Sequence, residues 1–351
     1  MVKIAKRYGM FFIILLSLAL ITGCGGGDKK PSAAQDAKVI EIKLAHSSPA
    51  VNDRLEMACQ AFKKHVEEKT NGKVKVTTYP NSQLGGEREQ LEGLQMGTIQ
   101  MAALSSGPLP GIFPQMMVFD MPYLFGTQKA AYEVLDGPVG QEILELMRAK
   151  TGIRGLVWGE NGFRHFTNSV RAVSKPADMQ GLKIRTMENP AHMAIVKALG
   201  GSPTPMAFNE VYSALQQKTI DGQENPISLI VSMRFYETQK YLTLDGHVYN
   251  PYLLLMNDKF YSGLSEDIKK IINEGAVIWR KVEREENNKQ IKGGMDKLKA
   301  GGMQITELTS DQLKAFREAT KPVYDTIGKK DVGEQLLNKV LKAVQEAESK
   351  K

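Results

Sequence analysis

The body of the chain opens with an alternation of strand and helix patterns, and this order restricts the fold more than any other feature. Apolar Ile40, Ile42 and Leu44 alternate with polar residues, which predicts a strand that ends in a loop at His46. The residues that follow predict, in order, a helix over about 52–70, a strand in VKVTTYP, a helix in GGEREQLEGLQMG and a strand in IQMAALSS. Because a βαβαβ order favours parallel strands covered by helices, we expect an α/β fold.

Three loops follow these strands and contain His46, residues 85–87 and Ser105. Ligands of open α/β sheets bind beyond the carboxyl ends of the strands. These three loops are therefore expected at the edge of the sheet where a ligand would bind.

The second half of the chain also alternates. GLKIRT is expected to be a strand, PAHMAIVKALG a helix ended by Gly200, and MQITEL a strand before two closing amphipathic helices. A long helical pattern begins after Ser265, which is a suitable N-cap, and Glu266 and Asp267 occupy the first turn, where acidic side chains are stabilising.

The first 23 residues have the pattern of a lipoprotein export signal. Lys3, Lys6 and Arg7 precede an apolar run over 10–21, which is shorter than the about 20 residues that a membrane-spanning helix needs. The run ends in ITGC, so Cys24 is the expected lipidation site and the mature N-terminus. The alternative is an ordinary cleaved signal with an incidental cysteine.

Residues 24–38 are expected to form a flexible tether, because their Gly, Pro, Ser and charged residues leave little to bury. The mature chain would then be a periplasmic, membrane-anchored protein. Removal of the signal lowers Lys plus Arg from 46 to 43 against 39 acidic residues, and a charge of +4 is too small to indicate nucleic-acid binding. Cys59 would be the one remaining thiol, and its helical spacing with Leu55 and Phe62 indicates a core residue.

The sequence carries no motif of a metal site or of a common enzyme class. Its five histidines form no HExxH pair, and its two cysteines form no CxxC. It also has no GxSxG elbow, phosphate loop or dinucleotide fingerprint. We therefore expect neither an enzyme nor a bound cofactor or metal.

Residues 202–226, SPTPMAFNEVYSALQQKTIDGQENP, join a Pro-stiffened turn, a short amphipathic helix and a polar loop, as in the wall of a pocket. This segment resembles the solute-binding proteins of tripartite ATP-independent periplasmic (TRAP) transporters, the DctP family. Four further segments occur in the family's order and spacing: NSQLGGEREQLEGLQMG, DMPYLFG, GFRHFTN and MQGLKIRTMEN. The resemblance covers residue 39 to the C-terminus.

The resemblance implies a two-lobed periplasmic-binding-protein-like α/β fold, with hinge strands and a long helix that spans both lobes. We place lobe I at 39–160 plus about 251–290, and lobe II at 161–250 plus about 291–351. The expected partners are a small carboxylate ligand and the membrane permease subunits, and the protein is expected to be a monomer.

The resemblance also assigns roles to residues of the cleft. Arg185 in GLKIRT is the expected partner of a substrate carboxylate, and a guanidinium fork matches the two oxygens of that group. Arg164 in GFRHFTN is a second expected contact, with a charge pair between lobes as the alternative. Asn225 offers an amide that both donates and accepts. Phe208 would give an apolar wall, or would be a buried aromatic.

His46 and Glu87 are expected to supply polar ligand contacts from the first sheet. Glu87 would hydrogen-bond a substrate hydroxyl, or would be the acidic first-turn residue of its helix. We rank C4-dicarboxylates and related hydroxy or keto acids first as ligands, and sugar acids such as uronates or aldonates next. A ligand-sensing protein and an enzyme on the same scaffold are the remaining alternatives.

Overall fold

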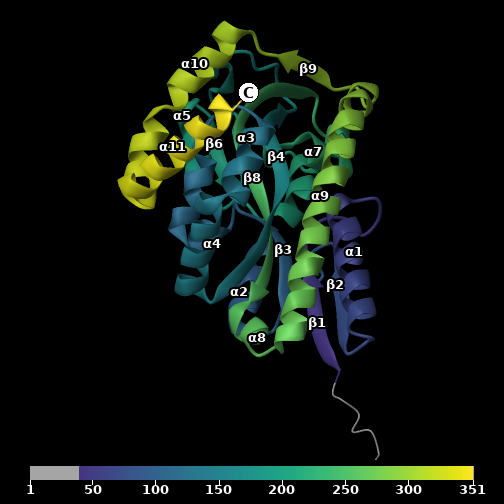
Figure 1. Cartoon of the computed structure of the whole chain (residues 1–351). Helices are drawn as coiled ribbons and strands as arrows, with labels where there is room; N and C mark the ends of the chain where they lie inside the picture. The colour runs from purple at the N-terminus through teal and green to yellow at the C-terminus, as the bar shows by residue number, and fades with distance from the viewer. Residues whose placement is uncertain (1–38, 351) are drawn as a thin grey trace, which may run out of the picture. The chain divides into compact units, whose positions relative to one another are not determined.

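In the computed structural model, which describes residues 39–350, the first three strands and two helices follow the predicted βαβαβ order (Figure 1). Strand β1 (Ile40–Ala45) pairs in parallel with β2 (Val74–Tyr79) on one side and β3 (Met101–Ser105) on the other. Helices α1 (Arg54–Lys69) and α2 (Glu87–Met96) connect these strands. The predicted signal, Cys24 and the predicted tether lie outside the described residues.

Two long antiparallel strands run through the centre of the sheet. β4 (Ile153–Asn168) and β8 (Tyr241–Asn257) pair along their whole lengths, and the sheet order is β2-β1-β3-β8-β4-β7-β5-β6. We call the β1–β3 side of these strands the first lobe. The second lobe is the side formed by β5 (Lys183–Thr186), β6 (Ser202–Pro205) and β7 (Gly222–Pro226).

The pairing of β4 with β8 is irregular at three places, and one of them lies between Glu160 and Gly162. Gly162 has φ of 111°, a backbone conformation that side chains with a Cβ rarely adopt. Irregularities of this kind bend a strand and increase its twist. β4 is therefore expected to bend near its middle. β4 and β8 are the two strands that join the lobes.

Helix α9 (Glu266–Ala300) is the long helix that the sequence predicted, and Ser265 caps it through a 3.4 Å hydrogen bond from the Ile268 amide. Its 35 residues correspond to a length of about 50 Å. It packs against α1 of the first lobe and against α7 (Ile227–Ser232), which follows β7 in the second lobe (Figure 1). The helix therefore reaches both lobes.

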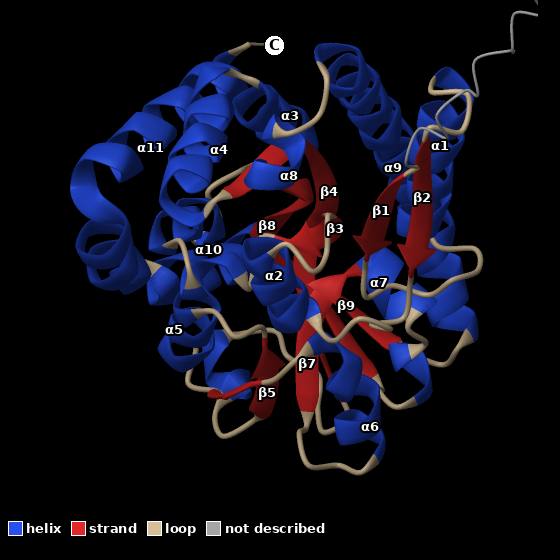
Figure 2. Cartoon of the chain, turned by 90° about the horizontal axis from the view of Figure 1, so that it is seen from below, coloured by secondary structure: helices blue, strands red, loops and turns tan. Residues whose placement is uncertain are grey.

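The apolar core has three parts. One lies between the first-lobe strands, α1 and α9, and it contains Cys59, whose full burial confirms the core assignment. A second lies under α6 (Val211–Gln216) and α7. β1 and β2 lie side by side next to α1 and α9 when the chain is seen from below (Figure 2).

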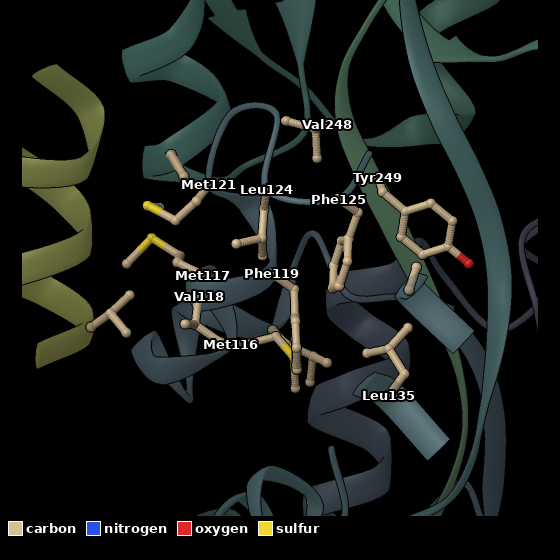
Figure 3. Packing of buried hydrophobic residues seen from close by; sticks show 14 of the residues in the cluster. Met116, Met117, Val118, Phe119, Met121, Leu124, Phe125, Leu135, Val248 and Tyr249 are labelled. Carbon is tan, nitrogen blue, oxygen red and sulfur yellow. The ribbon is translucent and has the colours of Figure 1, made fainter. Parts of the chain in front are cut away.

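The third and largest part is rich in methionine and aromatic side chains (Figure 3). Phe119, from the helical turn η2 (Pro114–Asp120), packs edge-on against Trp158 with ring centroids 5.3 Å apart. Phe125 makes a similar contact with Tyr249 at 5.5 Å. The loop between β3 and α3 (Gln128–Asp136) is therefore fixed to β4 and β8.

The closing segment is more elaborate than the predicted strand and two helices. β9 (Gln304–Glu307) pairs with β8, α10 (Ser310–Thr320) packs on α5 (Pro190–Ala198), and α11 (Glu334–Ser349) packs on α3 and on α4 (Pro138–Thr151). A π-helical segment, η6 (Tyr324–Gly333), joins α10 to α11. The short remaining elements are η1 (Leu109–Gly111), η3 (Pro176–Met179), η4 (Phe208–Glu210), η5 (Phe235–Glu237) and α8 (Asp258–Ser262). Among residues 39–350, no helix has the length and apolar character that a membrane crossing requires.

Candidate functional site

A cavity with an empty volume of about 280 Å³ lies where the two lobes meet. The first lobe contributes Ser48, Glu87 and Ser105; the second contributes Arg185, Met187, Phe208 and Leu229; the central strands contribute Asn161 and Tyr252. Ser105 ends β3, and Met187 follows the end of β5. The cavity therefore lies at the carboxyl edge of the parallel strands, where the sequence predicted a site.

Arg185 is buried near the end of β5 and is one of the residues that line this cavity. Its Nε and Nη2 atoms donate to the carbonyl oxygen of Met206, at 3.0 and 2.7 Å. Its Nη1 atom is buried and has no hydrogen-bond partner among the residues that the structure describes. One edge of the guanidinium fork is therefore fixed by the protein, and the other is available to an anion.

Burial, together with nearby Arg164, lowers the pKa of Arg185 to about 10. Arg185 therefore remains positively charged at neutral pH. The Phe208 ring, half-buried on η4, lies with its centroid 5.9 Å from the Arg185 Cζ atom, and it packs edge-on against Phe235 at 6.3 Å. The structure thus brings Phe208 and Arg185 together in one wall of the cavity.

Glu87 faces the cavity from the first lobe, as the first residue of α2. Its Oε1 atom accepts a hydrogen bond from the Ser105 backbone amide at 2.9 Å. Burial raises the pKa of Glu87 above its usual range, although the Ser105 amide and Arg185 oppose this shift. Glu87 is therefore the first-turn residue of its helix that the sequence indicated, and it also lines the cavity.

Arg164 does not line this cavity. Its Nε and Nη2 atoms donate to the Glu224 carboxylate, and its Nη1 atom donates to Asn250 Oδ1 at 3.3 Å. Burial opposes ionisation of Glu224, but Arg164 and His192 nevertheless hold the pKa of Glu224 well below its usual range. Arg164 is a member of a buried charge pair between β4 and β7.

Asn225 and His46 also lie outside the cavity lining. Asn225 is buried on β7, where its Nδ2 atom donates to Gln223 Oε1. His46 is buried after β1, with its Nε2 atom 2.7 Å from Glu56 Oε2. The structure therefore brings Arg185, Phe208 and Glu87 together and leaves His46, Arg164 and Asn225 behind the cavity wall.

Two lining residues that the sequence interpretation did not single out come from the central strands. Asn161 accepts from Arg54 Nη2 at 2.7 Å and donates to Asn250 Oδ1 at 2.8 Å, so its side chain is fixed at both ends. Tyr252 lies on the facing strand β8. The one sequence feature that could have indicated Asn161 as a site residue is its position, as a polar residue in a strand between two glycines, Gly159 and Gly162.

Arg54, which holds Asn161, is itself fully buried and donates from Nε to Glu283 Oε1 of α9 at 2.9 Å. The other Glu283 oxygen accepts from the Glu160 amide at 2.8 Å. Burial raises the pKa of Glu283 to about 7, although Arg54 opposes the shift. This network connects α1, α9 and β4 directly behind the cavity.

Met187 reaches from the second lobe to the first. Its Sδ atom lies 3.4 Å from Ser105 Oγ, and it lines both the 280 Å³ cavity and a neighbouring one of about 240 Å³. Asn189 crosses at the same place, because its Nδ2 atom donates to the Gly107 carbonyl oxygen at 3.0 Å. The lobes are therefore in contact around the cavity.

Two lobes joined by paired long strands, with a buried arginine in a cavity between them, define an extracytoplasmic solute-binding protein. The chain belongs to the DctP family of bacterial extracellular solute-binding proteins (family 7), whose model matches residues 44–331. The family works in TRAP transporters, and the chain is a TRAP solute-binding protein.

Individual relatives agree with this assignment. The C4-dicarboxylate-binding periplasmic protein DctP of Rhodobacter capsulatus is 36% identical over 84% of this chain and 88% of its own length. The sugar acid binding protein DctPAm of Advenella mimigardefordensis, solved with galactonate, has a TM-score of 0.85 and 34% identity, and the match covers 89% of this chain and 100% of that one. A TRAP solute-binding protein of Polaromonas sp. JS666 bound to D-erythronate has a TM-score of 0.82 and 39% identity over 86% and 98% of the two chains.

Proposed function

We propose that the protein captures a small organic acid in the 280 Å³ cavity by pairing its carboxylate with the free edge of Arg185, and delivers the acid to the membrane permease. The observation that carries this proposal is the buried, unpartnered Nη1 atom of Arg185. A buried donor without a partner costs about 1–3 kcal/mol, and a hydrogen bond to a charged group contributes about 1.5–3 kcal/mol. A carboxylate would satisfy that donor and supply a substantial part of the about 8 kcal/mol of a micromolar complex.

The ligand class is a C4-dicarboxylate or a related hydroxy or keto acid, with sugar acids as the second candidate. The ligands named for the three relatives support a carboxylate, because C4-dicarboxylates, galactonate and D-erythronate all carry one. Phe208 and Leu229 would cover the apolar part of such a ligand, and Glu87 would meet its polar end. Arg164, Asn225 and His46 would support these residues from behind the cavity wall.

Capture involves closure of the lobes, with boundaries at 39–160 plus about 251–290 and 161–250 plus about 291–351. The cavity is lined from both sides, so a bound acid contacts both lobes and favours the closed state over the open one. The closing segment would stabilise both lobes, since α10 packs on α5 and α11 packs on α3. The closed monomer would then dock on the permease subunits, and its role is capture rather than catalysis.

Membrane attachment through a lipid on Cys24 is a separate part of the proposal, supported by the export pattern of residues 1–23. Mass spectrometry of the mature protein would show a lipid-modified N-terminal cysteine. Replacement of Cys24 by Ala would release the protein into the soluble periplasmic fraction. An unmodified N-terminus would refute the anchor without affecting the binding proposal.

The binding proposal is tested by calorimetry of residues 39–351 against a panel of organic and sugar acids, with neutral sugars, peptides and cations as comparison ligands. At least one acid should bind, and Arg185→Ala should weaken that binding at least tenfold. Arg185→Lys keeps the positive charge but loses the planar fork of donors. Its affinity for the acid should therefore lie between those of the unaltered protein and of Arg185→Ala. Unchanged affinity in Arg185→Ala would contradict the assigned role, as would binding of uncharged ligands alone.

A further inference from the structure

The cavity has one positive and one negative side chain among its lining residues, Arg185 and Glu87. Arg185 comes from the end of β5 in the second lobe, and Glu87 comes from the start of α2 in the first lobe. A ligand that pairs its carboxylate with Arg185 therefore shares the cavity with a carboxyl group of the protein.

The buried arginines close to the cavity are already neutralised. Arg164 is paired with Glu224, and Arg54 is paired with Glu283. Both pairs are fully buried, so separating either one would leave an uncompensated charge in the interior. Neither arginine lines the cavity, so neither is placed to pair with a second carboxylate of the ligand.

One further arginine, Arg88, lines the neighbouring 240 Å³ cavity. Its Nε atom lies 3.3 Å from Glu92 Oε1, and its Nη1 atom lies 3.7 Å from Glu188 Oε1. Its side chain is 67% exposed, so water screens its charge. Because two carboxylates lie beside it, Arg88 does not supply a free positive charge to a ligand in the 280 Å³ cavity.

The remaining polar groups that line the 280 Å³ cavity can form hydrogen bonds with hydroxyl groups of a ligand. Ser48, Ser105 and Tyr252 present hydroxyls, and Asn161 presents an amide fixed by Arg54 and Asn250. The Ser105 amide holds one Glu87 oxygen at 2.9 Å, which orients the carboxyl group. A carboxyl group held in this way accepts hydrogen bonds from ligand hydroxyls.

We infer that Glu87 is a specificity-determining residue that makes this cleft selective for short hydroxylated monocarboxylates over dicarboxylates. The inference rests on the proposed pairing of a ligand carboxylate with Arg185, and it narrows the proposed ligand class by moving hydroxy acids and sugar acids ahead of C4-dicarboxylates. A second carboxylate would enter a low-dielectric site beside Glu87 with no cation to neutralise it. A hydroxyl at the same place donates to Glu87. The raised pKa of Glu87 agrees with a site in which additional negative charge is unfavourable.

The test uses a matched pair of four-carbon acids, meso-tartrate and D-erythronate, which differ in whether the far end carries a carboxylate or a hydroxyl. Calorimetry of the purified protein at pH 7.5 should show D-erythronate binding at least tenfold more tightly than meso-tartrate. The six-carbon pair galactonate and galactarate gives the same comparison for a longer chain. In Glu87→Gln, which keeps the acceptor for the Ser105 amide, the preference for the monocarboxylate should shrink at least tenfold.

Glu89→Gln is the matched control, because it removes the same charge from an exposed residue of the same helical turn. The preference of Glu89→Gln for the monocarboxylate over the dicarboxylate should equal that of the unaltered protein. The inference is overturned if the unaltered protein binds the dicarboxylate of either pair at least as tightly as the monocarboxylate, or if Glu87→Gln leaves the preference unchanged. Failure of every carboxylate to bind would instead refute the proposed function itself.

Discussion

Gly107 and Met187 meet across the two lobes so closely that a Cβ atom on Gly107 would lie 2.2 Å from the Met187 Sδ atom. Gly107 follows β3, Met187 follows β5, and both are buried. The absence of a side chain at residue 107 therefore permits the contact that closes one end of the cavity.

Gly107→Ala should weaken ligand binding, because the added methyl group displaces the Met187 thioether toward the cavity or holds the lobes apart. Overpacking of this kind costs about 1–3 kcal/mol, which corresponds to roughly a 5- to 150-fold loss of affinity. Calorimetry with the tightest acid of the panel measures the effect. Gly111→Ala in the same loop is the control, since a Cβ atom there meets nothing within 4 Å. Equal affinities for the two variants would contradict this account.

Met187→Ala should relax the limit on ligand length. Met187 lines both the 280 Å³ cavity and its 240 Å³ neighbour, so its removal would open one space into the other. Short acids should bind more weakly and six-carbon acids relatively better. The midpoint of thermal unfolding should fall as well, because truncation of a buried methionine costs about 2 kcal/mol or more. An unaltered ranking of four- and six-carbon acids would refute the role of Met187. Combined with Gly107→Ala, the change should restore part of the lost affinity, and a double-mutant cycle measures that coupling.

Two buried histidines of the central strands should make opposite contributions to the pH dependence of stability, because their pKa values are shifted in opposite directions. Burial lowers the pKa of His165 to about 4, and its Nδ1 atom accepts from the Gly246 amide at 3.0 Å. Unfolding at pH 4–6.5 therefore takes up a proton, so this histidine's contribution to stability is lost as the pH falls through that window.

His247 behaves in the opposite way. Burial opposes protonation, but Asp245 raises the pKa of His247 to about 9, with its Nδ1 atom 2.7 Å from Asp245 Oδ2. Its contribution is present below pH 6.5 and is lost as the pH rises toward 9, with an upper limit of about 3 kcal/mol. Urea unfolding between pH 5 and 9 measures the free energy of unfolding on both sides of pH 6.5. His247→Gln should reduce the fall in this free energy above pH 6.5 and leave its pH dependence below pH 6.5 unaltered. An unchanged fall above pH 6.5 would exclude His247 as its cause.

Glu283→Ala should destabilise the protein strongly, because it leaves Arg54 buried without its partner. Breaking a buried ion pair from one side costs about 3–5 kcal/mol. Glu285→Ala removes an exposed acidic residue of the same helix and should change the free energy of unfolding by less than about 0.5 kcal/mol. Urea unfolding compares the two variants. Equal losses would show that the Arg54–Glu283 pair contributes no more than a surface charge.

Patterns local in the sequence predicted much of this molecule. The alternation in residues 40–44 identified β1, and Ser265 with Glu266 and Asp267 identified the start of α9. The strand pattern of GLKIRT, together with the family resemblance, placed Arg185 beside the cavity. These features depend on residues that are neighbours along the chain, which is why periodicity and capping reveal them.

The features that were not predicted depend on pairing between distant segments. Arg164 meets Glu224 because β4 and β7 pair with His165 opposite Asn225, and a sequence alone does not give that register. Asn161 faces the cavity because β4 is irregular between Glu160 and Gly162. A shift of one residue in either strand would move these side chains to the other face of the sheet.

The position of Asn161 and Tyr252 on the strands that join the lobes has a consequence for how this protein can evolve. In the proposed closure, part of the surface that would contact the solute also bends as the lobes move, so a substitution there would change both the contact and the ease of closing. Affinity and the open-to-closed equilibrium are therefore not separately adjustable at these two positions. New solute preferences would arise more readily at Glu87, Met187 and Phe208, which lie at the ends of shorter elements and leave the joining strands unaltered.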